Sequence, residues 1–592
     1  MAPLNPFTGT LRKLVIAFDV GTTYSGIAYT ILDPGEIPKI QAVTRFPAQA
    51  NGDFKIPSVL WYTQDGQLRA AGAEAQLDEL RLEAEDDDLI YVEWFKLHLR
   101  PDVNKSVRSD EDTAPPLPTG KTVVDVFADF LGYLFSCAKL FITETHANGT
   151  SLWQSVEDRI EFVLSHPNGW EGPQQALMRQ ATVDAKLVPD NLSGRSRVHF
   201  VTEGEASLHY CLDSGLATDS INVDSSVLII DAGGGTVDLS TYQFKKILPI
   251  SVEEATAPSC IFQGSTKVNI RAKRYIENKL SSSSFGNSED INCMMQKFEK
   301  AAKPVFKDPK DRSFIQFGSM RDNDKNVGIR SGQLILSGDA VAEFFEPSVH
   351  AILEAAKTQI AESENPIRFA FLVGGFAASP YLYARLKKLL ERVEIELCRP
   401  DNHTNKAVAE GAISFHLQNF VSVRVLKTTY GTDHLVDYNP LDPEHYRRRW
   451  TVKAQPSGRQ MIPNAFSVLL SKGSRVRDNE EAKLDFWMES TQPSSLDYIY
   501  CDVMSYRGNM KAPSWTDAEP EAYVTLCSVK GDTSQIRKTP RLGSQGSMYY
   551  SQDFKIVLHC GLTELKAQIC WDEGGIERRG SASIVYDIEA IA

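Results

Sequence analysis

Three consecutive glycines follow an apolar run near the middle of this chain, and they constrain its fold more than any other feature. Residues 229–240 read IIDAGGGTVDLS, so a strand-like run enters a turn that two aspartates, Asp231 and Asp238, bracket. The pattern of a second strand follows the turn. Backbone N–H groups of glycines approach an anion closely, because no Cβ stands in the way. The segment therefore predicts a hairpin whose turn binds an anionic group.

An earlier segment repeats this design. Residues 17–26 read AFDVGTTYSG, and a further strand-like run follows at residues 27–32. Rossmann and P-loop sites place the phosphate at a helix N-terminus, whereas both of these turns lead into strands. The pair therefore predicts two hairpin turns that together hold one triphosphate. Two ordinary hairpins with tight glycine turns are the alternative.

Each predicted turn combines phosphate donors with a carboxylate. The donors are backbone N–H groups and hydroxyl groups, at Gly21, Thr22, Thr23, Gly233, Gly234, Gly235 and Thr236. Asp19 and Asp231 would repel phosphate oxygens directly, so their presence predicts a hard cation at this place. Mg²⁺ that is held largely through its water molecules suits this chemistry.

A third glycine element completes the pattern. Residues 371–380 read FLVGGFAASP, so a strand ends at two glycines and a helix opens after them. Alone this element is a weak signal. In one chain with two phosphate turns, it predicts a small backbone platform for a purine.

The apolar pattern predicts an α/β architecture up to about residue 420. Apolar runs that end in polar or glycine-rich groups predict buried strands, at residues 14–18, 162–164, 200–201, 227–230 and 369–373. Helical patterns alternate with them, at residues 122–141, 171–185, 339–361 and 380–391. We expect Pro347 to break the third of these helices. The carboxyl ends of the strands are expected to converge on one site.

Composition and charge exclude several functions. The 592 residues carry a net charge of −14, with 42% apolar and 24% charged side chains, so we expect a globular chain that binds no nucleic acid. The nine cysteines are scattered, which favours a reducing compartment. No signal peptide is evident, and no apolar run approaches the about 18 residues of a membrane span. A cytoplasmic protein without a membrane partner is therefore the expectation.

The three glycine elements resemble the seventy-kilodalton heat-shock chaperones of the DnaK type, which belong to the ATPase superfamily of actin, hexokinase and these chaperones. DVGTTYSG at residues 19–26 is similar to the family's first phosphate loop, DAGGGTVD at residues 231–238 to its second, and LVGGFAASP at residues 372–380 to its adenosine motif. The resemblance covers about residues 11–420. It implies an α/β chain with a two-lobed actin-like ATPase fold, built from ribonuclease H-like halves.

The resemblance also implies catalytic roles. Glu203 and Asp231 would orient the attacking water and the Mg²⁺ shell, with Asp19 nearby. Thr236 would touch the γ-phosphate of ATP. Lys96, in WFKLHL, would be aimed at the transferred phosphate, where its charge would be stabilising. A surface position is the alternative for this lysine.

Further residues are implied as contacts of ATP or ADP. They are Tyr24, Glu299, Lys303, Gly374, Gly375 and Phe376. Glu299 and Lys303, one helical turn apart, would clasp the adenosine. Ala378 stands where the chaperones carry an arginine, so cation stacking on the adenine is lost. Phe376 would restore some stacking, and a place in the core is its alternative.

The C-terminal part departs from the chaperones. After residue 420 short alternating runs predict mainly β structure, without the family's linker, peptide-binding signature or helical lid. This part resembles the divergent group typified by heat shock 70 kDa protein 12. We expect an actin-like nucleotide-binding domain at residues 11–425, with an upper-lobe insertion at about residues 265–340, and a divergent β domain at residues 426–592.

The function that follows is that of an ATP-binding, Mg²⁺-dependent ATPase with low turnover, acting as a chaperone-like switch without a standard peptide-binding domain. An unidentified protein client or co-chaperone is its expected partner, besides the nucleotide. A pseudo-ATPase scaffold that binds ATP but hydrolyses little is an alternative, suggested by Ala378. A small-molecule kinase of the same superfamily is another, since an aspartate could act as base for a substrate hydroxyl. Filament formation of the actin kind is a third.

Overall fold

The computed structural model of the chain describes most of its residues. These are residues 4–49, 51–100, 114–170, 172–215, 221–400, 404–477, 480–544, 546–560 and 565–580. The chain divides into two compact units, which we call the first and the second unit. The first comprises Met1–Trp170 and Leu177–Val421, and the second comprises Glu171–Ala176 and Ser422–Ala592. The mixed α/β architecture with several sheets that the sequence predicts is confirmed.

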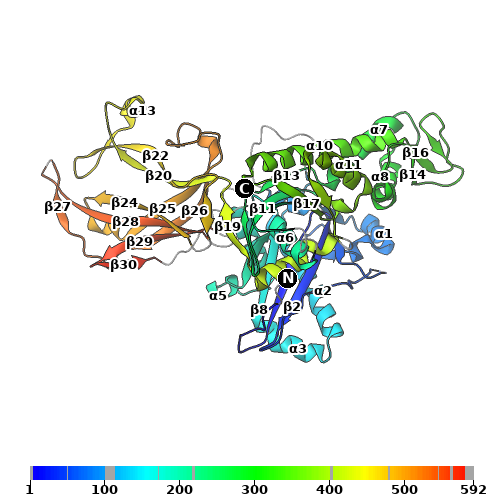
Figure 1. Cartoon of the computed structure of the whole chain (residues 1–592), viewed down its shortest axis with the longest axis horizontal. Helices are drawn as coiled ribbons and strands as arrows, with labels where there is room; N and C mark the ends of the chain where they lie inside the picture. The colour runs from blue at the N-terminus through cyan, green and yellow to red at the C-terminus, as the bar shows by residue number, and fades with distance from the viewer. Residues whose placement is uncertain are drawn as a thin grey trace. The chain divides into compact units, whose positions relative to one another are not determined.

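The first sheet of the first unit contains the earlier glycine hairpin. Its order is β3 (Gln41–Ala42), β2 (Tyr24–Leu32), β1 (Lys13–Asp19), β8 (Ile160–His166) and β9 (Val198–Thr202), and β4 (Lys55–Pro57) also pairs with β2. Strands β1 and β2 are antiparallel, with Asp19 opposite Gly26. Strand β8 runs parallel to β1 on the other side (Figure 1). The predicted hairpin is therefore present, next to a parallel strand.

The second sheet repeats this arrangement. Within the first unit, its order is β18 (Glu396–Cys398), β17 (Ile367–Val373), β10 (Ser226–Ala232), β11 (Val237–Ile247) and β12 (Ile250–Glu254), and β13 (Ser259–Ile261) also pairs with β11. Strands β10 and β11 form the GGG hairpin, with Asp231 opposite Asp238. Strand β17 runs parallel to β10. Each sheet thus places a glycine hairpin beside a parallel strand that also ends at the turn.

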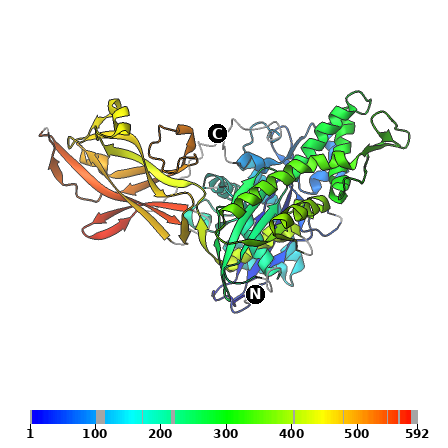
Figure 2. The ribbon, with the colours of Figure 1, turned by 45° about the horizontal axis from the view of Figure 1, so that its top comes forward.

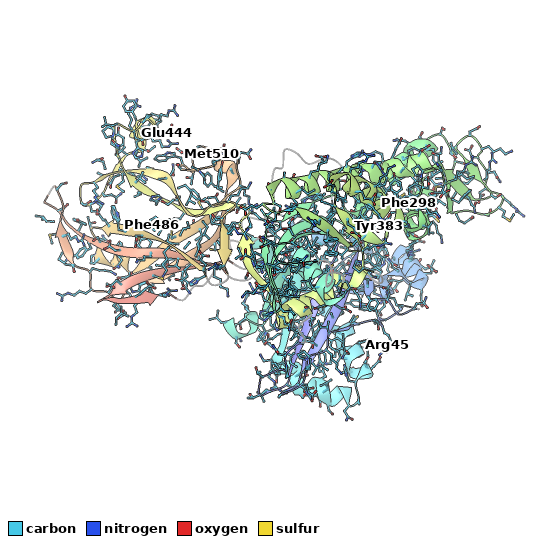
Figure 3. All side chains as sticks on the ribbon, in the orientation of Figure 1. Arg45, Phe298, Tyr383, Glu444, Phe486 and Met510 are labelled. Atoms are coloured by element: carbon cyan, nitrogen blue, oxygen red, sulfur yellow. The ribbon has the colours of Figure 1, made fainter. Side chains whose placement is uncertain are left out.

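A large apolar core lies between the second sheet and its helices. Helix α10 (Gly338–Glu362), the long green helix of Figure 2, packs against α7 (Ser265–Leu280) and α11 (Pro380–Leu390). Phe298, labelled in Figure 3, and Phe345 are buried in this core. Burial of such rings stabilises the folded state by about 2–3 kcal/mol each. The helices are thereby fixed on the sheet that carries the GGG turn.

The expected break at Pro347 is wrong, because α10 runs through it without interruption. A proline inside a helix removes one hydrogen bond and costs about 3 kcal/mol. Two features offset this cost. The flanking residues Phe345 and Val349 are buried in the core, and Arg271 donates to the Phe344 carbonyl at 3.0 Å and to Ser348 Oγ at 3.1 Å. Tertiary packing therefore overrides the local preference.

Helix α2 (Val123–Thr145) corrects the expectation that no segment is apolar enough to span a membrane. By length and composition alone, this helix of 23 residues could cross one. However, 56% of its most apolar stretch is buried in the structure, including Phe127, Phe130 and Leu134. Such burial is typical of a core helix.

The second unit contains two antiparallel sheets. The first has the order β21 (Lys453–Ala454), β22 (Gln460–Leu470), β20 (Thr429–Asp437), β25 (Tyr498–Tyr506) and β26 (Tyr523–Asp532). The second has the order β24 (Glu480–Ser490), β28 (Met548–Cys560), β29 (Leu565–Glu573) and β30 (Ile576–Arg579), and β27 (Pro540–Leu542) pairs with β28. Ile499 and Val503 of one sheet share a core with Phe554 and Ile556 of the other, and Phe486 packs against it (Figure 3).

The remaining elements are shorter. Two further small sheets are formed by β5 (Val59–Tyr62), β6 (Leu68–Ala71) and β7 (Ile90–Glu93), and by β14 (Ser313–Gln316), β15 (Ile329–Arg330) and β16 (Gln333–Leu336). The other α-helices are α1 (Asp78–Asp86), α3 (Gly149–Val156), α4 (Gly172–Asp184), α5 (Leu192–Arg195), α6 (Glu203–Asp213), α8 (Ser288–Lys297), α9 (Lys303–Val305), α12 (Ala407–Leu417) and α13 (Pro443–Arg447).

Candidate functional site

The two glycine turns lie directly against each other. A Cβ placed on Gly234 would overlap the side chain of Thr23, and one placed on Gly235 would overlap that of Thr22. Within the GGG turn, the Gly233 N–H donates to the Thr236 carbonyl at 2.9 Å. Only residues without side chains permit so close an approach. The structure therefore brings together the two turns that the sequence singles out.

The N-terminus of α7 supports the GGG turn from one side. The N–H groups of Gly264, Ser265 and Thr266 donate to the carbonyls of Gly235, Gly233 and Gly234, at 3.2, 3.1 and 2.9 Å respectively. A trans peptide plane points its N–H away from its carbonyl. The N–H groups that follow these three carbonyls therefore point away from α7, which is the orientation that phosphate binding requires.

Two buried aspartates lie at the ends of the strands that enter the turns. Asp19 pairs with Lys55 of β4 and accepts a hydrogen bond from Ser165 Oγ at 3.0 Å. Asp231 accepts a hydrogen bond from Ser207 Oγ at 2.6 Å. Burial, with the nearby negative charge of Glu203, raises the pKa of Asp231 to about 7. Asp231 is therefore a carboxylate whose charge a cation would stabilise.

Lys96 and Glu203 form an ion pair inside the protein. The Nζ and Oε1 atoms are 2.6 Å apart, and Lys96 is only 3% exposed, so the surface alternative for this lysine is excluded. Glu203 opens α6 directly after β9, and Thr202 caps that helix by accepting the Glu205 N–H at 3.2 Å. The Lys96 ammonium also lies 5.5 Å from the Trp170 ring centroid.

The two charges of this pair affect each other's pKa. Burial lowers the pKa of Lys96, but the carboxylates of Glu203 and Asp19 outweigh it, so the net pKa is raised. Burial raises the pKa of Glu203, and the Lys96 charge opposes that shift. Both side chains are thus held in place by charge as well as by packing.

Glu299 and Lys303 contact the N-terminal part of α7 through the side chain of Asn269. The Lys303 Nζ donates to Asn269 Oδ1 and the Asn269 amide donates to Glu299 Oε1, both at 2.8 Å. The direct Lys303–Glu299 distance is 3.9 Å. Burial lowers the pKa of Lys303. Burial, followed by the negative charge of Glu299, raises the pKa of Tyr24.

The third glycine element reaches the same place. Gly374 has a φ of +91°, and a Cβ there would overlap the Asp231 carboxylate, whereas Gly375 faces open space. Phe376 is 4% exposed and stacks on Phe345, with ring centroids 6.0 Å apart. Its ring therefore lies in the core, which was the alternative to stacking on the adenine. Ala378 is exposed.

Several residues that form hydrogen bonds or ion pairs in this site were not predicted from the sequence. They are Lys55, Ser165, Ser207, Gly264, Ser265 and Asn269. The glycine before the helix pattern at residue 265 was an available signal for the α7 terminus. The other contacts join elements that are far apart in the chain, and no local sequence pattern predicts them.

The chain is similar to known heat-shock proteins. No family model matches it. Heat shock 70 kDa protein 12A of Homo sapiens is 24% identical over 573 residues, which cover 82% of this chain and 80% of that protein, and the Mus musculus protein gives the same figures. Heat shock 70 kDa protein 12B of Homo sapiens is 22% identical over 553 residues, covering 80% and 78%. The chain is therefore a divergent relative of the heat shock 70 kDa protein 12 group.

Proposed function

We propose that the first unit is a two-lobed, actin-like ATPase module that binds ATP through its two glycine turns. The observation that carries the proposal is the contact of Gly234 with Thr23 and of Gly235 with Thr22. The repeated design of the two sheets supports two lobes. The names of the relatives support a place in the heat-shock 70 and actin-like ATPase superfamily.

The carboxylates of the site fit a hydrated Mg²⁺ ion. Asp19 and Asp231 are both buried, and after burial and the charge of Glu203, the negative charge of Asp19 also raises the pKa of Asp231. Oxygen ligands of this kind suit Mg²⁺ that keeps several waters. When bound, the ion would neutralise charge on the phosphate oxygens.

The chain's own residues would perform the remaining tasks. The N–H groups of the GGG turn bind phosphate oxygens, and the Lys96 ammonium stabilises charge on the transferred phosphoryl group. Glu203, fixed by Lys96, accepts a hydrogen bond from the attacking water and orients it. Thr236 places a hydroxyl at the same turn. Glu299, Lys303 and Asn269 supply the polar contacts of the nucleoside.

A nucleotide-binding scaffold with little hydrolysis is the second candidate. Its supporting observation is the pairing of Asp19 with Lys55, because the lysine already supplies a positive charge to one of the two carboxylates. Calorimetric titration with ATP measures binding, and steady-state phosphate release measures hydrolysis. Binding without release in the unmodified chain, with release gained in a Lys55→Met variant, would favour the scaffold and attribute it to this pairing.

The proposal that the turns bind ATP is tested by a substitution that blocks the GGG turn. Gly234→Asp adds a side chain against Thr23 and a negative charge where phosphate would bind, so the ATP-induced increase in melting temperature should disappear. Gly132→Asp is the matched control, since a Cβ there meets nothing within 4 Å and α2 does not contribute to the turns. Equal ATP shifts in both variants and in the unmodified chain would contradict the proposal.

We further infer a switch whose nucleotide state is read by the second unit and by a protein client or co-chaperone in the cytoplasm. The support is the similarity to heat shock 70 kDa proteins over about four fifths of the chain. Thr236→Ala should slow hydrolysis and retain ATP. Partners that are captured by this variant with ATP, and released with ADP, would identify the client.

A further inference from the structure

Two histidines and a glutamate gather away from the nucleotide site. Glu161 lies near the start of β8, His199 on β9 and His416 on α12. One ligand atom from each lies within 4.8 Å of the others. Glu161 precedes Ser165 by four residues on β8, which is about 13 Å along a strand. The cluster is therefore separate from the turns.

Strand register explains why these side chains meet. Val163 pairs with His199, and Glu161 lies two residues before Val163, so Glu161 and His199 project from the same face of the sheet. Val15 pairs with Glu161, which places Lys13 on that face as well. Helix α12 contacts β1 and β8, and it contributes His416.

Two of the three distances between the ligand atoms match those of a metal centre. Both His199 Nε2 and His416 Nε2 lie 3.3 Å from Glu161 Oε2. Around a tetrahedral Zn²⁺ with bonds of about 2.0–2.1 Å, neighbouring ligand atoms are about 3.4 Å apart. The rings are 5.0 Å apart between centroids and inclined at 62°, so they converge without stacking.

The His199 Nε2 atom provides independent evidence. It is buried, and its contact with Glu161 Oε2 at 3.3 Å is an ion pair when the ring is protonated but does not have the geometry of a hydrogen bond. A buried polar nitrogen without a partner is costly. If the lone pair of Nε2 is directed at a metal ion that Glu161 also binds, it is not directed at the Glu161 oxygen itself. A shared ion therefore explains why these two atoms are close but do not have hydrogen-bond geometry.

The rest of the surroundings suit an ion. The Lys13 ammonium donates to the other carboxylate oxygen, Oε1, at 2.7 Å, which orients the carboxylate and leaves Oε2 for the metal. The side chains of Glu161, His199 and His416 are 19%, 37% and 17% exposed, so an ion can enter from solvent.

We propose that Glu161, His199 and His416 bind one divalent transition-metal ion, with Zn²⁺ as the best match. Two imidazoles and one carboxylate are a ligand set that Zn²⁺ prefers, with water in the fourth position, whereas Mg²⁺ and Ca²⁺ prefer oxygen ligands alone. Because the ligands come from two strands and a helix, the bound ion would tie α12 to the sheet. This proposal does not depend on nucleotide binding.

Metal titration of the full-length, chelator-treated protein tests the proposal. Co²⁺ serves as the visible probe and Zn²⁺ as the competitor, both without nucleotide. One Co²⁺ per chain should bind with an absorption typical of nitrogen and oxygen ligands, and Zn²⁺ should displace it. A sulfur charge-transfer band would instead indicate cysteine ligands and would overturn the assignment.

Variants make the test specific. His199→Ala, His416→Ala and Glu161→Gln should each weaken binding by more than the roughly 10- to 100-fold that outer-shell changes cause. His350→Ala is the matched control, because His350 lies 3.5 Å from a single carboxylate, Glu346, and should change nothing. Melting curves with chelator confirm that each variant folds. Equal affinity in the histidine variants and the unmodified chain, or no binding by the latter, would overturn the proposal.

Discussion

Lys96 and Glu203 share a buried contact of 2.6 Å between residues that are 107 positions apart in the chain. The side chains are 4% and 11% exposed, so neither charge is stabilised by bulk water. Removing one partner of such a pair leaves an uncompensated buried charge, which is far more costly than the net contribution of the intact pair. The pair thus links the position of the expected catalytic lysine to that of the expected catalytic glutamate.

Lys96→Met should lower the free energy of unfolding by about 3–5 kcal/mol, measured by urea denaturation, because Glu203 loses its partner. The double variant Lys96→Met with Glu203→Gln should lose less than the sum of the single changes, by about 0.5–3 kcal/mol. Lys121→Met is the control, since its 2.7 Å pair with Asp129 is more exposed and should be worth about 0–1 kcal/mol. Additive single changes would show that the pair is not coupled.

Asp231→Asn should reduce Mg²⁺-dependent phosphate release at least about tenfold, because an amide is a poorer partner for a hydrated cation. The melting temperature without ligand should change little or rise, since the substitution removes a carboxylate whose charged form burial disfavours. Thermal melting and steady-state phosphate assays measure the two effects. A variant with undiminished hydrolysis would remove Asp231 from the mechanism.

Ala378→Arg should tighten ATP binding. Ala378 is exposed beside the open Gly375, so a guanidinium there can reach an adenine ring, and a cation–π contact of about 0.5–2 kcal/mol corresponds to about 2- to 30-fold in affinity. Calorimetric titration measures the change. Ala378→Met supplies bulk without charge and should give a smaller gain. If both substitutions weaken binding equally, adenine does not lie at this motif.

Glu93 should make stability depend on pH. Burial, followed by the charge of Glu299, raises its pKa to about 7, against about 4.3 for an unperturbed glutamate. The stabilising contribution of protonated Glu93 is complete below the unfolded pKa and is lost as the pH rises through about 7. Relative to the unmodified chain, Glu93→Gln should therefore gain stability between pH 5 and pH 8. Urea denaturation at both values, with the exposed Glu394→Gln as control, decides the matter.

The sequence predicted those parts of the structure that depend on local backbone chemistry. Both hairpins form where glycines and alternating apolar residues indicate them, and the strands that enter them end at Asp19 and close to Asp231. Gly374, which the sequence places at the end of a strand, has a positive φ, and such a conformation favours glycine. The contact between the two turns was predicted because two related anion sites in one chain imply a shared ligand.

Other features depend on tertiary packing that no local pattern reveals. Pro347 remains helical because its neighbours are buried, and the Phe376 ring lies in the core because Phe345 covers it. Lys55 reaches Asp19 only because β4 pairs with the hairpin. The Glu161 cluster joins residues separated by 38 and 217 positions in the sequence (199 − 161 and 416 − 199). The periodicity of apolar residues gives no information on contacts between residues so far apart in the chain.

The three hydrogen bonds between the glycine carbonyls and the start of α7 have a mechanical consequence. If a ligand shifts the GGG turn, α7 must shift with it or break these bonds. The helix has 16 residues, so its far end lies about 24 Å from the turn. Its apolar face, which includes Val268, Ile276 and Leu280, packs in the surrounding core. A shift of the turn that keeps these three hydrogen bonds would therefore reach the far end of α7.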